Sequence, residues 1–227
     1  MSKILALDTS TDACSVALSL NGEIQEDFRI IPRQHTQQLL PMVQEMLANA
    51  QLAVTDLDAI AFGRGPGSFA GIRIATGVTQ GLAYAADLPV LPVSTLAALA
   101  LAASDKEQVS SVVAALDARM NEIYVASYQI ESGELTTLLD EKVCAPSALS
   151  LAEGSYFAVG SGWRYIEDMS SDTQNAISVS EELYYPSAAH MLKLAEQDWA
   201  QGKAVAADKA LPVYLRDEVA WKKKDQQ

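Results

Sequence analysis

Two aspartates stand at the ends of apolar runs and are the residues best placed to do chemistry. The two runs end in the same three-residue sequence, Ala6-Leu7-Asp8 and Ala115-Leu116-Asp117. A carboxylate at the end of a strand can reach a metal ion through water, and the backbone N–H groups of a glycine-containing hairpin can hold a phosphate. The pair therefore points to a nucleotide site between two similar halves.

The segments that follow the two aspartates are poorly suited to binding a phosphate. The first contains hydroxyl residues but no glycine, and the second places Arg119 where a glycine would be needed. The turn Gly160-Ser161-Gly162 could still approach an adenosine. We interpret the following residues as a vestigial nucleotide site: Asp8, Ser10, Asp117, Gly160 and Gly162. The alternative, which we favour, is that the aspartates only accept hydrogen bonds from turn amides.

Other catalytic motifs are weak. The segment from Gly63 to Ser68 superficially resembles a dinucleotide-binding loop, but Pro66 removes an N–H donor and no lysine follows as in a P-loop. His35 and His190 are too far apart in sequence to form an HExxH or HxxxH pair, so we expect no zinc or iron centre. Ser/His/Asp catalysis stays open, although the sequence contains no GxSxG elbow.

Composition limits the class of protein. The formal charge of −13 argues against unaided binding to a phosphate backbone, because such affinity comes largely from Lys and Arg. No apolar run approaches the roughly 20 residues needed to cross a bilayer, and the N-terminus does not have the pattern of a signal peptide. We expect a soluble cytoplasmic protein, and any role in RNA chemistry would need a basic partner.

The elements around the first aspartate alternate in a βββαβαβα order. Apolar patterns and turn signals predict strands at 4–8, 14–20, 23–31, 59–63 and 88–93, and helices at 34–50, 68–86 and 95–103. The pair Asn21-Gly22 is a strong hairpin signal, and Ser68 is placed to cap the second helix.

The second half repeats this order more weakly. Strands are predicted at 112–117, 122–130, 135–144 and 156–160, with a short helix from 147, a helix near 165 and a longer one at 187–199. Two βββαβα-like halves are typical of the two-lobed actin-like, sugar-kinase and heat-shock ATPase fold. We predict lobes at 1–104 and 105–227, the second smaller, with both aspartates pointing into the cleft between them.

The helix predicted after Ser68 is unusually rich in small residues. Each glycine costs a helix up to about 1 kcal/mol relative to alanine, so close packing on two sides is expected in return. Its larger residues form an i, i+4, i+8 stripe of Ile74, Val78 and Leu82. We predict that this stripe and three residues of the preceding helix, Leu39, Met42 and Met46, form an exposed partner interface. The alternative is that both sets are core.

The segment Gly65-Pro-Gly-Ser-Phe-Ala-Gly-Ile-Arg-Ile-Ala-Thr-Gly, followed by Gly81-Leu-Ala, resembles the signature of the TsaB (YeaZ) family. Stretches at 5–10, 116–124 and 214–221 agree in order and spacing. The resemblance covers essentially the whole chain, and it implies an actin-like fold with a reduced second lobe.

The resemblance also implies a function. It implies a non-catalytic subunit required for threonylcarbamoylation of the adenosine adjacent to the anticodon in tRNAs that read codons beginning with A. Such a subunit forms a homodimer alone and a heterodimer with TsaD, the metal-holding paralogue that transfers threonylcarbamoyl, and the P-loop ATPase TsaE joins that pair. It implies no intrinsic cofactor, although an adenine nucleotide could sit at the partner interface, and it implies tRNA contact only through the complex.

Two hypotheses from other classes compete with this one. Asp8 and Asp117 would suit an autonomous actin-like ATPase or kinase. A metallopeptidase, a label that members of the family have carried, is disfavoured by the lack of metal ligands.

Overall fold

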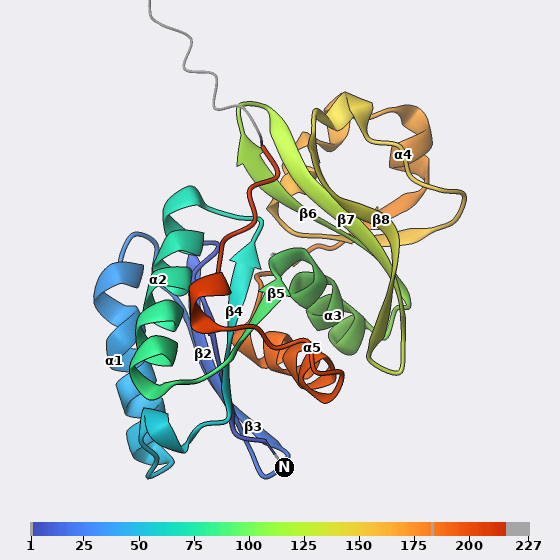
Figure 1. Ribbon diagram of the computed structural model, residues 1–227. Coiled ribbons are helices and arrows are strands. Elements are labelled where there is room, and N and C mark those ends of the chain that lie inside the picture. The colour runs from blue at the N-terminus through green and yellow to red at the C-terminus, as the bar shows by residue number, and fades with distance from the viewer. Residues whose placement is uncertain (1, 183, 217–227) are drawn as a thin grey trace, which may run out of the picture.

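The computed structural model describes residues 2–182 and 184–216 and contains two five-stranded sheets (Figure 1). The first comprises β1 (Ile4–Asp8), β2 (Ala13–Leu20), β3 (Glu23–Ile30), β4 (Ala59–Gly65) and β5 (Val90–Ser94). The second comprises β6 (Ser111–Arg119), β7 (Glu122–Glu131), β8 (Glu134–Cys144), β9 (Tyr156–Val159) and β10 (Ile177–Val179).

The two sheets share one topology. Their strand orders are β3-β2-β1-β4-β5 and, read in the matching direction, β8-β7-β6-β9-β10. In each sheet the first three strands form an antiparallel meander and the last two run parallel to the first. The repeat confirms the predicted duplication and the α/β actin-like fold class.

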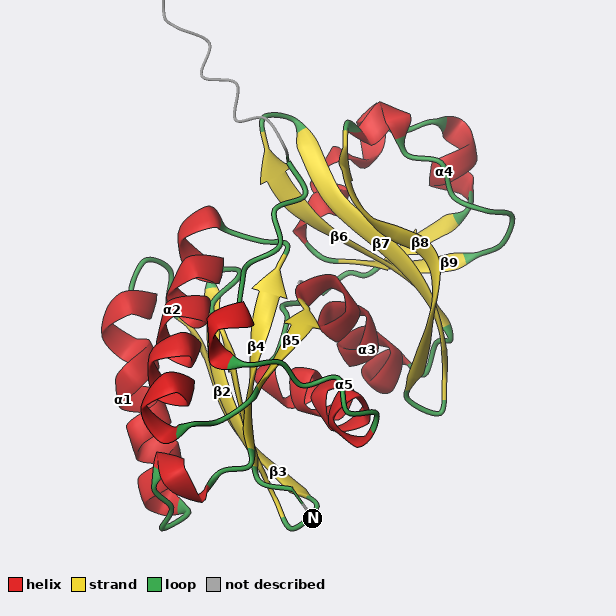
Figure 2. Ribbon diagram, in the orientation of Figure 1, coloured by secondary structure: helices red, strands yellow, loops and turns green. Residues whose placement is uncertain are grey.

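The α-helices of the first half have 13 to 18 residues, whereas the second half has one of 5 residues and one of 13. Figure 2 shows the helices in red. The α-helices are α1 (His35–Asn49), α2 (Phe69–Ala86), α3 (Thr95–Glu107), α4 (Ser171–Asn175) and α5 (Ala188–Ala200). The 3-10 helices are η1 (Val54–Asp56), η2 (Pro146–Ala148), η3 (Ser161–Asp168) and η4 (Ala207–Lys209). Only 3-10 turns stand where helices were predicted after 147 and near 165, so the second half is reduced.

Serine hydroxyls begin the three helices that matter most for the architecture. Ser68, Ser94 and Ser187 each accept a hydrogen bond from the backbone N–H three residues later. This is the preferred way to satisfy an N–H group that has no partner within the helix. The predicted cap at Ser68 is therefore confirmed.

Both faces of each central strand are buried. In β1, Leu5 and Leu7 face the core that contains α1, whereas Ile4 and Ala6 face the core that contains α5. In β6 the alternation separates a core shared with α3 from one shared with η3. A strand covered on both faces has an apolar residue at nearly every position, which is why these strands read as continuous apolar runs.

The two halves exchange their last helices. Helix α3 follows β5 of the first sheet but packs on β6 and β7 of the second. Helix α5 follows β10 of the second sheet but packs on β1, β2, β4 and β5 of the first, and the two helices contact each other between the sheets (Figure 1).

This exchange corrects the predicted domain boundary. A cut near Ser104 falls inside α3, and residues 188–200 cover the first sheet, although they were assigned to the second lobe. The segment after α5 also returns to the first lobe, where Val205 pairs with Val90 of β5, before Arg216 bonds to Ala118 and Glu122 of the second lobe. The part of the C-terminal signature stretch that follows Arg216 lies outside the described residues.

Among residues 2–182 and 184–216, no helix has both the length and the apolarity that a bilayer crossing requires.

Two glycines of α2 should respond oppositely to one substitution. A Cβ on Gly71 would lie 1.9 Å from the carbonyl oxygen of Thr9, whereas a Cβ on Gly77 would meet nothing within 4 Å. We expect Gly71→Ala to destabilise the chain by about 1–3 kcal/mol or more, through overpacking against backbone. Gly77→Ala should stabilise it by up to about 1 kcal/mol, the usual gain for this change in an exposed helix.

Urea unfolding of both variants, under conditions in which light scattering shows a monomer, checks this pair of predictions. Equal effects of the two changes would show that the contact between Gly71 and Thr9 does not constrain the fold.

Candidate functional site

Asp8 is enclosed by its own chain. Its side chain is fully buried, and Oδ1 accepts hydrogen bonds from the backbone N–H of Ser10 at 3.0 Å and from the Ser10 hydroxyl at 2.9 Å. The other oxygen, Oδ2, has no hydrogen-bond partner and lies over Gly63, where an added Cβ would come within 2.0 Å of it. Burial raises the pKa of Asp8 to about 7, against the opposing effect of Ser10.

The loop after β1 is filled by the turn that begins α2. The Ser68 N–H donates to the Ser10 carbonyl at 2.7 Å, and the Thr9 hydroxyl donates to the Gly71 carbonyl at 2.7 Å. A Cβ on Gly67 would lie 2.5 Å from the Ser10 carbonyl oxygen, so only glycine permits this approach. The backbone and hydroxyl groups that could have met a phosphate are thus bonded within the chain.

Asp117 lies beside the turn that contains Gly160 and Gly162, and its polar groups are hydrogen-bonded within the chain. The Asp117 N–H donates to the Ser161 hydroxyl at 3.1 Å, and the Asp117 carboxylate accepts from the Arg119 N–H at 2.8 Å. Both glycines are required by packing, because a Cβ on either would lie within 3 Å of Ala115. These residues therefore hold η3 against β6, as the turn-amide alternative predicted.

The two Ala-Leu-Asp sequences place their aspartates on different faces of the two sheets. Ala6 and Asp8 point toward α5, the helix donated by the other half, since Ala6 shares a core with Met191 and a Cβ on Gly63 would meet both Asp8 and Met191. Ala115 and Asp117 instead face η3 of their own half. A shift of one residue reverses the face of every side chain. The prediction that both aspartates point into one cleft is therefore wrong.

One Ser/His/Asp contact exists at the start of α5. Ser187 Oγ lies 3.0 Å from His190 Nδ1, and Asp105 Oδ2 lies 3.5 Å from His190 Nε2. Ser187 is nevertheless buried and already accepts the His190 N–H as the helix cap, and Asp105 also pairs with Lys193. Burial lowers the pKa of His190. The arrangement joins α5 to α3 and presents no accessible nucleophile.

The prediction for the partner interface is wrong for α1. Leu39, Met42 and Met46 are all buried in the first core, because α1 turns this stripe toward the sheet. The α2 stripe of Ile74, Val78 and Leu82 is only half-buried, and it packs against the same core. This stripe lies between α1 and α2 at the edge of the core, next to the exposed surface of α2.

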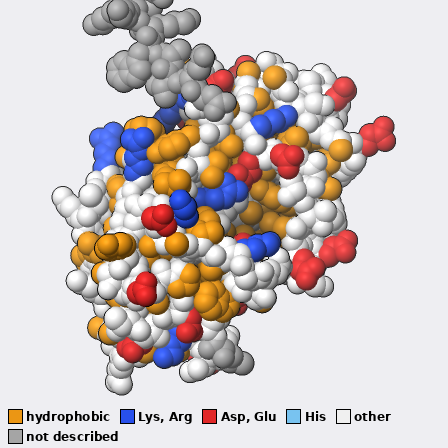
Figure 3. Space-filling view, in the orientation of Figure 1, with side chains coloured by type: hydrophobic (Ala, Val, Ile, Leu, Met, Phe, Trp, Pro, Cys, Tyr) orange, Lys and Arg blue, Asp and Glu red, His pale blue; other side chains and the backbone are white. Residues whose placement is uncertain are grey.

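The solvent-facing side of α2 is instead made of small residues flanked by two aromatic rings. The exposed residues are Phe69, Ala70, Arg73, Gly77, Gly81, Tyr84 and Ala85. The largest, Tyr84, is 85% exposed. Figure 3 shows hydrophobic surface in several patches on the side of the molecule where α2 and the C-terminal segment lie, with acidic and basic side chains between them.

An ordered cluster stands at the N-terminal end of this face. The Arg73 guanidinium lies 3.6 Å from the centre of the Phe69 ring, and its Nε donates to the Tyr214 hydroxyl at 2.8 Å. Both aromatic rings remain about half exposed. The sequence pattern of Phe69 and Arg73, spaced i and i+4, signals half of this cluster. Tyr214 comes from a segment 141 residues away and carries no local signal.

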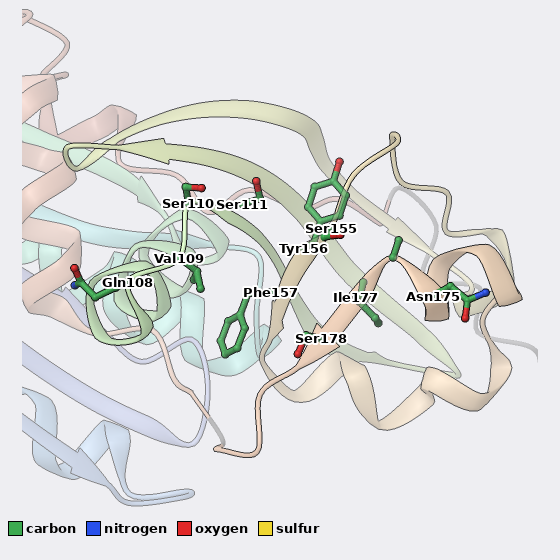
Figure 4. A pocket seen from close by; sticks show the side chains of 11 residues that line it. Gln108, Val109, Ser110, Ser111, Ser155, Tyr156, Phe157, Asn175, Ile177 and Ser178 are labelled. Carbon is green, nitrogen blue, oxygen red and sulfur yellow. The ribbon is translucent and has the colours of Figure 1, made fainter.

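One surface depression is separate from the predicted site residues. It has a volume of about 680 Å³ and lies beside the first residues of β6, β9 and β10 (Figure 4). Its lining includes serines, Gln108, Asn175 and Tyr156 but no charged side chain. Within residues 2–182 and 184–216, no three His, Cys, Asp or Glu side chains are placed to hold a metal ion.

The raised pKa of Asp8 predicts a pH dependence of stability. Protons bind Asp8 more tightly in the folded chain, so its favourable contribution is complete below about pH 4 and is lost as pH rises through about 7. A shift of about three pKa units corresponds to at most about 4 kcal/mol. Asp8→Asn removes this dependence, so its stability relative to the parent chain should rise between pH 5 and pH 8.

Urea unfolding of both chains at the two pH values measures the change, with exposed Asp208→Asn as the control. A stability difference that does not vary with pH would show that Asp8 titrates normally.

Comparison with known proteins agrees along nearly the whole chain. The family model described as TsaD, tRNA N6-adenosine threonylcarbamoyltransferase, matches residues 29–224. The Escherichia coli K12 protein named tRNA threonylcarbamoyladenosine biosynthesis protein TsaB is 44% identical over 97% of this chain and 97% of its own length. The Haemophilus influenzae protein of the same name is 44% identical over 97% and 96%.

The structural comparison gives the same result. The structure titled YeaZ from Pseudomonas aeruginosa superposes with a TM-score of 0.89 at 47% identity, covering 95% of this chain and 100% of that one. The agreement extends through both lobes and both exchanged helices. The chain therefore belongs to the TsaB (YeaZ) family and, over residues 29–224, matches the wider family described as TsaD.

Proposed function

We propose that this protein is a non-catalytic subunit in the biosynthesis of threonylcarbamoyladenosine in tRNA. The observation that carries the proposal is the 44% identity to the TsaB of Escherichia coli over 97% of both chains. In this role it binds and activates the catalytic paralogue TsaD together with the ATPase TsaE, and it contacts tRNA only within that complex. The charge of −13 supports this division of labour, because a tRNA contact needs cations that a partner would supply.

A binding role is supported by the state of the residues that could have been catalytic. Although the matching family model bears the name of a transferase, Asp8 and Ser10 are buried and bonded to their own chain. The glycines at 160 and 162 pack on Ala115 and leave no room for a ligand between them and β6. These residues do not fit an intrinsic nucleotide. We therefore assign any adenine nucleotide to the interface with a partner.

We assign the partner surface to the exposed face of α2, with Ile74 and Val78 at its rim. Gly77 and Gly81 lie one turn apart and have open space where a Cβ would stand. Glycine weakens an exposed helix, so its presence here is explained if another helix approaches closely. The flanking Phe69, Arg73 and Tyr84 are of the types that dominate interface energetics. A second copy of the chain would occupy the same face in a homodimer.

A bulky residue at Gly77 should separate folding from assembly. Gly77→Leu fills open space in the free chain, so the midpoint of urea unfolding should not fall. The same side chain would keep a docked helix at a distance, so we expect affinity for TsaD to fall by at least about tenfold, or roughly 1.4 kcal/mol. Size-exclusion chromatography with light scattering, followed by titration calorimetry, measures both the heterodimer and the homodimer.

Ala200→Leu is the matched control, because it adds a similar bulk at an exposed position of α5. It should bind TsaD like the parent chain. If Gly77→Leu binds with unchanged affinity, the partner surface lies elsewhere, and if the parent chain forms no complex with TsaD, the proposed subunit role is wrong.

A further inference from the structure

One ion pair joins the lobes beside the turn that begins α2. Arg64, at the end of β4 in the first lobe, places an Nη atom 3.0 Å from Glu141 Oε2 on β8 of the second lobe. The two side chains are only 25% and 15% exposed. Charges this far removed from water are held in place more strongly than those of a surface pair, and loss of one partner leaves the other poorly solvated.

The same glutamate also contacts the start of α3. Its other oxygen, Oε1, accepts from the hydroxyl of Ser94, the residue that caps this helix. The next residue, Thr95, donates its hydroxyl to the carbonyl of Pro66. Glu141 is therefore linked to the turn Gly65–Ser68 from two directions, through Arg64 and through the α3 cap.

The C-terminal segment completes the enclosure of Arg64. The Val213 N–H donates to the Arg64 carbonyl at 2.8 Å, and a Cβ on Gly65 would lie 3.3 Å from the Val213 carbonyl oxygen. The neighbouring Tyr214 bonds to Arg73 on the first turns of α2. Arg64 thus connects β4, the C-terminal segment and the edge strand of the other lobe.

We propose that Arg64 and Glu141 form an interlobe clasp through which the second lobe fixes the turn Gly65–Ser68 and hence the position of the partner-facing helix α2. The inference gives the reduced second lobe a positioning role, and its consequence for assembly rests on the proposed function. Glu141 acts on partner binding through Arg64 and the turn, without touching the partner itself.

Hydrogen exchange of the free protein tests the clasp without any partner. Glu141→Gln keeps the shape of the side chain and removes its charge, and Arg64→Gln removes the other half of the pair. In each variant we expect exchange of the amides at 67–72 to accelerate by about fivefold or more, because this segment loses an anchor. Glu134→Gln, an exposed position on the same strand, should leave these amides unchanged.

The double variant decides whether the two residues act as one unit. Because both single changes break the same ion pair, the acceleration of exchange at 67–72 in Arg64→Gln/Glu141→Gln should fall short of the product of the two single effects. Effects that multiply, or amides that exchange at the parent rate in both single variants, would overturn the clasp. Using two single variants keeps the test valid if one of them fails to fold.

Affinity for TsaD then tests the consequence for assembly. Glu141→Gln should weaken binding by about threefold to tenfold while Glu134→Gln does not, and equal affinities of Glu141→Gln and the parent would overturn the positioning role. If the parent chain itself fails to bind TsaD, the proposed function fails, but the exchange result still decides whether the clasp exists.

Discussion

The mutual burial of α3 and α5 is the contact on which the architecture depends. Each helix is produced by one half of the chain and covers the sheet of the other half, and the two meet between the sheets. The α5 residues Ala188, Met191, Leu192 and Ala195 are completely buried. Burial of a side chain the size of Met or Leu contributes roughly 1.5–3 kcal/mol. Removal of α5 would lose these contributions and expose a whole face of the first sheet. The lobes are thus one cooperative structure, despite having two sheets.

Local signals predicted most of the elements, since each needs only nearby residues. The first meander follows from the apolar alternation and from Asn21-Gly22, and the hydroxyl of Ser68 defines the start of α2. The placement of α5 has no such signal, because its apolar stripe fits either sheet equally well. Likewise the α1 stripe of Leu39, Met42 and Met46 fits a core or an interface, and only the packing decides between them.

The candidate site was harder to predict than the fold for a similar reason. The similarity of the phrases around Asp8 and Asp117 is real in sequence, but the pleat of each sheet determines which face receives the carboxylate. To predict that Gly67 and Ser68 fill the loop after β1, one would need to know which segments meet at the ends of β1 and β4. The end of β1 is thus occupied by a turn of the same chain, and the outward face of α2 stays exposed.

The exchanged helices also constrain how the chain is made. When β1 to β5 have left the ribosome, the face of the first sheet that includes Ile4 and Ala6 has no cover, because α5 begins only at Ala188. At synthesis rates of roughly 5–20 residues per second, making residues 95–200, which complete α5, takes about 5–20 seconds. During that interval the nascent chain presents an apolar surface to its surroundings. The first sheet therefore cannot complete its core during synthesis until α5 has been made.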